Sequence, residues 1–251
     1  MKMMFTTLCA VVSLLISAPA NQKPAANKSA DAKQARVLLV TGCDVPSHQW
    51  RKTTSVLREQ LEQTGKFEVV VCEEPLVLES SALASYDVIL INYYNWKRPS
   101  ITPKAQKNLT EFVRNGKGLV SFHLSCRAFG DWPEYRDLIG RVWVKGSGHG
   151  PRKPFKTKIT DTNHFITAGL SDFDTDDELY AKLVGDAKIN VLIEAYSDWS
   201  KRTEPLAWTL NYGKGRVFNI VLGHDVKALS NPNFAKLLTQ GTQWVVERSA
   251  K

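Results

Sequence analysis

Cysteine is scarce in this chain, with 4 residues among 251. No CxxC pair occurs, which excludes a cysteine-rich zinc site. Cys9 lies in the N-terminal apolar run, so an odd number of cysteines remains and a disulfide scaffold is excluded. Cys43 and Cys72 each follow an expected strand. We interpret them as two buried free thiols, with one disulfide between them as the alternative.

The motifs of several enzyme classes are also absent. There is no GxSxG nucleophile elbow and no HExxH metal motif. The segment Gly146–Gly150 has the pattern GxGxG, but the Lys-Ser/Thr pair of a phosphate-binding loop does not follow it. These absences argue against a serine hydrolase of that type, a zincin protease and a nucleotide-binding protein.

Charge of one sign is not concentrated anywhere. Lys and Arg number 33 and Asp and Glu 25, and the surplus of +8 is spread along the chain. The densest basic cluster contains no motif that reads nucleic acid; it comprises Arg152, Lys153, Lys156 and Lys158. We therefore expect a solvated basic surface and no nucleic-acid partner.

Apolar runs long enough to span a bilayer, about 20 residues, are missing. The longest run, Phe5 to Ile16, follows Lys2 and precedes Ala18-Pro19-Ala20, the layout of a secretory signal peptide. We predict that residues 1–20 are cleaved after Ala20, which the intact mass of the exported protein tests. An uncleaved anchor is the alternative. The mature protein would be periplasmic or secreted, without a stable membrane anchor.

The rest of the chain is predicted to hold one domain. Residues 21–35, rich in Ala, Lys and Asn, are predicted to be a disordered leader, and residues 36–248 the folded domain. Continuous apolar runs typical of buried parallel strands alternate with helical patterns in the first half. The predicted strands there are Arg36–Thr41, Phe67–Val71, Asp87–Asn92 and Gly118–His123, and the predicted helices are Trp50–Thr64 and Thr102–Asn115.

The second half has a different pattern. Glycines in Tyr212-Gly213-Lys214-Gly215 indicate a hairpin turn between two apolar runs. The predicted strands are Lys156–Asp161, Val191–Ala195, Leu206–Asn211 and Arg216–Leu222, and the predicted helices are Pro133–Ile139 and Asn231–Arg248. The fold class is therefore α/β: a single doubly wound, mostly parallel sheet of the flavodoxin-like type, extended by an antiparallel hairpin.

All 5 histidines fall at expected strand ends or in loops. Ligands of open α/β sheets bind outside the carboxyl ends of the strands, so this placement favours one shared site. Imidazoles near carboxylates can bind a divalent metal or act as general acid and base. Each histidine alone can equally be a hydrogen-bonded structural residue. The histidines are His48, His123, His149, His164 and His224.

Carboxylates and aromatic residues lie near the same loops. The candidate carboxylates are Asp44, the run Asp176-Asp177-Glu178, and Asp225, which can orient His224 or cap the following turn. Aromatic faces beside polar groups suit sugar rings, although each aromatic alone can be a core residue. The aromatics are Trp50, Trp96, Trp132, Tyr180 and Trp208.

Short segments spread over residues 36–248 share the order and spacing of a known family. They are Val37–Gly42 with His48 and Trp50, Gly116–His123, Trp132–Tyr135, Leu138–Gly140, His149-Gly150, His164 with Ile166–Leu170, Asp177–Tyr180, Pro205, Ala207-Trp208, Gly213–Val217 and Leu222–Asp225. Together they resemble the ThuA-like trehalose-utilisation family, whose fold is similar to that of class I glutamine amidotransferases. One departure is Phe165, where the family usually has proline.

In the amidotransferase fold a cysteine nucleophile ends the central strand, and a histidine from a late strand activates it. By resemblance, His123 stands at the nucleophile position and His224 at the histidine position. An imidazole cannot form the thioester of glutamine hydrolysis, so amidotransferase activity is not expected.

The resemblance implies a role in carbohydrate metabolism and in the handling of 3-keto sugars, and the signal-peptide pattern implies export. We expect an enzyme acting on a keto-sugar, such as a 3-keto-glycoside, or on a glycoside, as a lyase, isomerase or hydrolase. A partner sugar oxidoreductase would make the ketone, and a divalent transition metal, Zn or Mn, is the expected cofactor. The alternative is a non-catalytic sugar-binding or accessory module. The expected catalytic residues are His123, His224 and Asp225; the substrate-binding residues His48, Trp50, His149, Asp177, Tyr180 and Trp208; and the metal ligands His48, His123, His149 and His224.

Overall fold

The computed structural model describes residues 33–95 and 101–247. The predicted signal peptide, most of the predicted leader and Trp96 lie outside these residues. Ala35, which the sequence assigned to the leader, is the first residue of a strand and donates its N–H to Lys66. In this part of the chain, no helix has the length and apolarity to cross a membrane.

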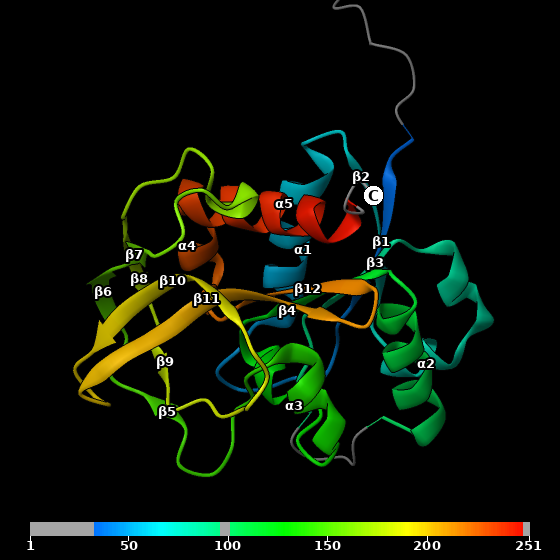
Figure 1. The fold of residues 1–251 in the computed structure, drawn as a ribbon, viewed down its shortest axis with the longest axis horizontal. Coiled ribbons are helices and arrows are strands. Elements are labelled where there is room, and N and C mark those ends of the chain that lie inside the picture. The colour runs from blue at the N-terminus through cyan, green and yellow to red at the C-terminus, as the bar shows by residue number, and fades with distance from the viewer. Residues whose placement is uncertain (1–32, 96–100, 248–251) are drawn as a thin grey trace, which may run out of the picture. The chain divides into compact units, whose positions relative to one another are not determined.

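An 8-stranded sheet forms the centre, with strand order β2-β1-β3-β4-β12-β11-β10-β7 (Figure 1). The pairs from β2 to β12 are parallel, and those from β12 to β7 are antiparallel. The mostly parallel α/β fold and its hairpin extension are therefore confirmed. The strands are β1 Ala35–Val40, β2 Phe67–Cys72, β3 Val88–Ile91, β4 Gly118–Phe122, β7 Lys158–Ile159, β10 Asn190–Ser197, β11 Arg202–Tyr212 and β12 Gly215–Ile220.

Helices cover both faces of this sheet. Figure 1 shows α1, α4 and α5 on one face and α2 and α3 on the other. Thr102 accepts a hydrogen bond from the Ala105 N–H and caps α2. The helices are α1 Trp50–Glu62, α2 Pro103–Arg114, α3 Pro133–Ile139, α4 Val226–Leu229 and α5 Pro232–Val246, with 3₁₀ turns η1 Pro75–Glu79, η2 Ser81–Ser85, η3 His123–Arg127 and η4 Phe165–Thr167.

The predicted strand Lys156–Asp161 is wrong as one element. Buried Thr157 directs both its N–H and its hydroxyl to the carbonyl of Phe173, which divides the segment. Residues before Thr157 form β6 (Lys153–Lys156), which pairs with β8 (Asp174–Asp177), whereas β7 joins the main sheet. A second small sheet pairs β5 (Gly148–His149) with β9 (Tyr180–Ala181).

These two small sheets supply the side chains that face the carboxyl ends of the parallel strands. β4 ends at Phe122 and is followed by His123, and β12 is followed by the loop that carries His224. Tyr180 of β9 contacts His123 at this edge, with ring centroids 4.6 Å apart, and His149 of β5 lies next to Tyr180, with ring centroids 5.9 Å apart. These side chains therefore gather at the edge of the sheet where the strand-end rule for open α/β sheets predicts a ligand site.

Candidate metal and sugar site

His123 is the most constrained residue of the site. It directly follows β4, is 2% exposed, and has a positive φ of 44°, a conformation that costs a non-glycine residue about 1–3 kcal/mol. Its Nδ1 lies 2.9 Å from the Val221 carbonyl oxygen. Because a carbonyl only accepts, Nδ1 carries the proton and Nε2 presents a lone pair. The fold thus maintains a strained backbone to aim this lone pair.

Two further groups meet the Nε2 atom of His123. The Nε2 atom of His48 lies 3.1 Å from it, and the Tyr180 hydroxyl donates to it at 2.9 Å. His48 comes from the loop after β1, where its Nδ1 contacts the Ser47 hydroxyl at 2.8 Å. Two imidazole lone pairs at this separation repel unless a proton or a cation lies between them.

Glu178 and His224 complete the cluster. The Oε2 atom of Glu178 lies 3.1 Å from the Nδ1 atom of His224, but the two atoms are not aligned for a hydrogen bond. Among the described residues both atoms are buried without a hydrogen-bond partner. The same Oε2 lies 3.8 Å from His123 Nε2 and 4.0 Å from His48 Nε2. An unpartnered buried acceptor costs about 1–3 kcal/mol, so these atoms call for a ligand.

The donor atoms of His48, His123, Glu178 and His224 all lie within 4.8 Å of one another. Zinc binds nitrogen at about 2.0–2.1 Å, so two ligand atoms at a tetrahedral angle are separated by about 3.3 Å. The observed separations of 3.1–4.0 Å bracket that value. Three imidazoles and one carboxylate suit Zn, Mn, Fe or Co. This cluster, which we call the His₃Glu cluster, can hold a metal ion.

The charge states of His48, His123 and Glu178 match this role. Burial, and then the neighbouring His224, lowers the pKa of His48 to about 4. Burial, followed by His48, holds the pKa of His123 well below its ordinary value. Burial opposes ionisation of Glu178, but His224, His123 and His149 outweigh it and lower its pKa to about 2. Glu178 raises the pKa of His224. At neutral pH, His48 and His123 are thus neutral and Glu178 is ionised, the forms that bind metal.

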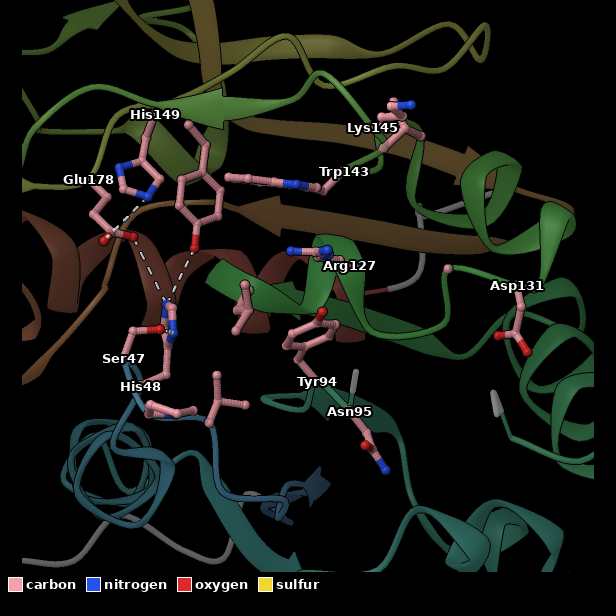
Figure 2. A pocket seen from close by; sticks show the side chains of 16 residues that line it. Ser47, His48, Tyr94, Asn95, Arg127, Asp131, Trp143, Lys145, His149 and Glu178 are labelled. Atoms are coloured by element: carbon pink, nitrogen blue, oxygen red, sulfur yellow. Dashed lines mark hydrogen bonds and ion pairs between the residues drawn. The ribbon is translucent and has the colours of Figure 1, made fainter. Parts of the chain in front are cut away.

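His149 lies beside the cluster but is not one of its four members. Its Nδ1 contacts the Gly150 carbonyl at 2.7 Å, so Nδ1 carries a proton. The Nε2 atom of His149 lies 3.6 Å from Oε1 of Glu178 (Figure 2). The structure therefore replaces His149 with Glu178 in the predicted ligand set and places the Nε2 atom of His149 next to that carboxylate.

A cavity of about 940 Å³ opens beside the cluster. This volume is at the upper end of the range of about 300–1,000 Å³ typical of small-molecule sites. His48, His149, Glu178 and Tyr180 line it, and so do residues that the sequence did not single out (Figure 2). These are Tyr94, Asn95, Arg127, Asp131, Trp143 and Lys145 among others.

Asp177 and Asp225, expected in the site, act on the backbone around it. Asp177 is buried, which raises its pKa to about 6, and it accepts hydrogen bonds from the N–H groups of Gly223 and His224 at 2.6 and 3.1 Å. Asp225 caps α4 through the Ala228 N–H and pairs with Arg152. Both carboxylates hold the segment that carries His224, and neither lines the cavity.

Of the aromatic residues predicted for the site, some lie at the cluster and others have structural roles. Tyr180 reaches the cluster, whereas Trp50 donates its Nε1–H to Asp44 at 2.8 Å and Trp132 is buried in the core. Trp208 is fully buried in β11 and donates its Nε1–H to the Ile139 carbonyl at 2.9 Å.

Trp208→Phe is expected to lower the free energy of unfolding by about 2 kcal/mol, because it removes a buried hydrogen bond and leaves a void. Metal content and sugar affinity should stay at wild-type levels. Urea denaturation and sugar titration measure the two effects. A loss of sugar affinity at unchanged stability would instead place Trp208 in substrate binding.

His164 does not share the site, so the expectation of one site for all five histidines is wrong for this residue. Its ring packs on Trp244 with centroids 5.3 Å apart, and Arg216 is among the charges acting on it. Arg216 pairs with Gly118 at the start of β4, the opposite end from His123. Cys43 and Cys72 are free thiols as expected, but both are partly exposed.

The fold and the sequence have known relatives. A family model described as "ThuA: Trehalose utilisation" matches residues 36–245. A ThuA-like protein from Parabacteroides merdae is 26% identical with a TM-score of 0.77, covering 87% of this chain and 93% of its own. A ThuA-like protein from Bacteroides uniformis is 19% identical with a TM-score of 0.67, covering 89% and 95%. A β-galactosidase from Bacillus circulans shares the fold over 84% of this chain and 30% of its own, at 14% identity and a TM-score of 0.54. No curated protein matches the chain.

Proposed function

Since the chain belongs to the ThuA family of trehalose-utilisation proteins, we propose that it is a metal-assisted enzyme acting on 3-keto-glycosides. Membership of the family gives a role in carbohydrate utilisation. The reaction is our proposal, and one observation carries it: two ligand atoms of the His₃Glu cluster, Glu178 Oε2 and His224 Nδ1, have no hydrogen-bond partner among the described residues, and the cluster lies beside a cavity of about 940 Å³.

Zn²⁺ or Mn²⁺ is the ion that we propose for His48, His123, Glu178 and His224. When bound, a divalent cation supplies Lewis-acid polarisation of a carbonyl oxygen. A sugar oxidised at C3 has such an oxygen, and its C2–H is acidified by the adjacent ketone. A neutral sugar hydroxyl offers neither property, so the keto-sugar matches the chemistry of the cluster better than the parent glycoside.

We assign the role of general base, which removes the C2 proton, to His149. Its Nδ1–H is donated to Gly150, so the neutral ring would present a lone pair at Nε2, and Oε1 of Glu178 at 3.6 Å would stabilise the imidazolium that forms. The proton moves from C2 to Nε2, and the C–H electron pair becomes the double bond of an enediolate. Lyase, isomerase and hydrolase outcomes can all proceed from this first step.

Tyr180 is the second residue to which we assign a role in catalysis. Its buried hydroxyl lies 2.9 Å from His123 Nε2 and 3.4 Å from His48 Nε2. A cation bound by the Nε2 atoms of His123 and His48 would occupy the lone pairs of both atoms. The Tyr180 hydroxyl would then no longer donate to His123 and could donate its hydrogen bond to the developing O3 anion. Burial raises the pKa of Tyr180 well above its ordinary value, so the group acts as a donor.

Exchange of the C2 proton in D₂O tests this proposal directly. We expect the metal-loaded protein to incorporate one deuterium into methyl 3-keto-β-D-glucoside, as measured by mass spectrometry, and none into methyl β-D-glucoside. Absence of exchange and of any other chemical change in the keto-sugar would contradict an enzymatic role. A keto-sugar that binds and is recovered unchanged would favour the alternative, a sugar-binding or accessory module, for which the cavity aromatics Tyr94 and Trp143 are suited.

The place of action is also a proposal. The signal-peptide pattern in residues 1–20 supports export to the periplasm or beyond. A 3-keto-sugar arises by two-electron oxidation of a secondary hydroxyl, so a sugar oxidoreductase must act before this protein. We therefore propose that the two enzymes share a compartment.

A further inference from the structure

Arg127 is held in the cavity in an unusual way. It ends the 3₁₀ turn η3, four residues after His123. Its guanidinium carbon lies 5.1 Å from the centre of the Tyr94 ring and 5.8 Å from that of Trp143. Figure 2 shows the side chain between these two aromatic residues, and Arg127 lines the same cavity as His48 and Tyr180. Contacts with aromatic rings fix the plane of a guanidinium while leaving its edge N–H groups available.

No carboxylate neutralises this arginine in residues 33–95 and 101–247. The same holds for Lys145, the second strong cation that lines the cavity. The cavity carboxylates, Glu178 and Asp131, form no ion pair with either cation, and Glu178 is engaged with imidazoles. Most other described arginines, by contrast, hydrogen-bond to a protein oxygen, as Arg152 does to Asp176 and Asp225.

We propose that the sugar bound in this cavity carries an oxyanion, a carboxylate or a sulfate ester, and that Arg127 binds it with Lys145 assisting. This inference rests on the proposed function only in taking the ligand to be a sugar. A planar guanidinium donates two parallel hydrogen bonds to a carboxylate or sulfate, a geometry that single hydroxyls do not match.

The desolvation of Arg127 decides between a neutral and an acidic sugar. A ligand that fills the cavity strips water from the guanidinium. A neutral sugar replaces that water with weak acceptors and leaves the positive charge uncompensated. An acidic sugar supplies charge-assisted hydrogen bonds at the same place, so the acidic ligand binds more tightly.

Matched glycosides test the inference by calorimetry on the metal-loaded protein. Methyl β-D-glucuronide and methyl β-D-glucoside differ only at C6, and the 6-sulfate of the glucoside separates a sulfate from a carboxylate. We expect at least one acidic glycoside to bind about 10- to 100-fold more tightly than the neutral one. Arg127→Gln should remove that preference, and Lys145→Gln should reduce it. Arg136→Gln is the control, since this exposed arginine on α3 also forms no ion pair with any described residue but lies outside the cavity lining.

Three outcomes would overturn the inference: equal affinity for acidic and neutral glycosides, no detectable binding of either acidic glycoside, or a preference that Arg127→Gln leaves intact. The last would mean that the anion contacts another group. The readout is binding, so it is independent of turnover. If the acidic preference holds while C2 exchange fails, the anion site stands and the enzymatic proposal falls.

Discussion

His224→Ala and Glu178→Gln are each expected to abolish stoichiometric metal binding. The wild-type protein, purified without chelators and loaded with Zn²⁺ or Mn²⁺, should hold about one equivalent, as a single four-ligand site does. His224→Ala removes one nitrogen donor. Glu178→Gln keeps the side-chain volume and removes the negative charge that offsets the cation. Loss of a direct ligand should weaken binding by more than the roughly 10–100-fold typical of outer-shell partners.

The control for these variants is His164→Asn. His164 packs on Trp244 away from the cluster and accepts the Ile166 N–H, a role that asparagine can keep. Elemental analysis should find wild-type metal content in this variant, and circular dichroism should find native folding in all three. Full metal content in both cluster variants, or none in the wild-type protein after loading, would contradict the assignment.

His149→Gln is expected to separate metal binding from chemistry. The variant should hold one equivalent of metal, because His149 is outside the His₃Glu cluster, and should lose C2 exchange by about 10²–10⁴-fold, the usual contribution of a general base. Glutamine keeps polar contact with the loop but cannot accept a proton at neutral pH. Deuterium incorporation into methyl 3-keto-β-D-glucoside, measured at saturating sugar, gives the rate.

Tyr180→Phe is the companion variant in this assay. It removes the hydroxyl that contacts His123 at 2.9 Å while preserving the ring, which packs between Trp143 and His149. Exchange should fall by about 10²–10³-fold, as for loss of one donor to a developing oxyanion. If His149→Gln and Tyr180→Phe both exchange deuterium at wild-type rates, the acid–base roles are wrong even if the metal site is right.

The architecture was predictable because burial on both faces leaves a strong mark on parallel strands. Runs such as Val37–Val40 and Val88–Ile91 are apolar throughout and cannot be solvent-exposed strands. The glycines around Gly213 also predicted the hairpin correctly, and Gly213 has a φ of +61°. The sequence did not predict that the segment Lys156–Asp161 is divided at Thr157, because this division depends on where the Phe173 carbonyl lies in the folded chain.

The site was predictable to the extent that it follows from strand ends. His48, His123 and His224 leave different strands at the same edge, which the sheet topology alone implies. The sequence analysis chose Asp177 rather than Glu178 from the acidic run. Glu178 and Leu179 lie between β8 and β9, so no strand period indicates which carboxylate accompanies Tyr180. In the structure, Glu178 and Tyr180 line the large cavity, whereas Asp177 and Leu179 line a smaller one.

Arg127 had no comparable signal. It belongs to a short 3₁₀ turn, where neither the strand nor the helix period predicts direction. Its partners Tyr94 and Trp143 come from segments far apart in the chain. Only the folded arrangement shows that an arginine without a carboxylate enters the cavity of a sugar-utilisation protein.

X-ray absorption at the edge of the bound metal tests the central claim most directly. Spectra of the Zn²⁺-loaded wild-type protein should fit three imidazole nitrogens and one carboxylate oxygen at about 2.0–2.2 Å. The imidazole signal should fall by one ligand in any His224→Ala protein that retains zinc. A spectrum of water and carboxylate oxygens without imidazole, or one unchanged in His224→Ala, would show that the metal is not bound by the His₃Glu cluster.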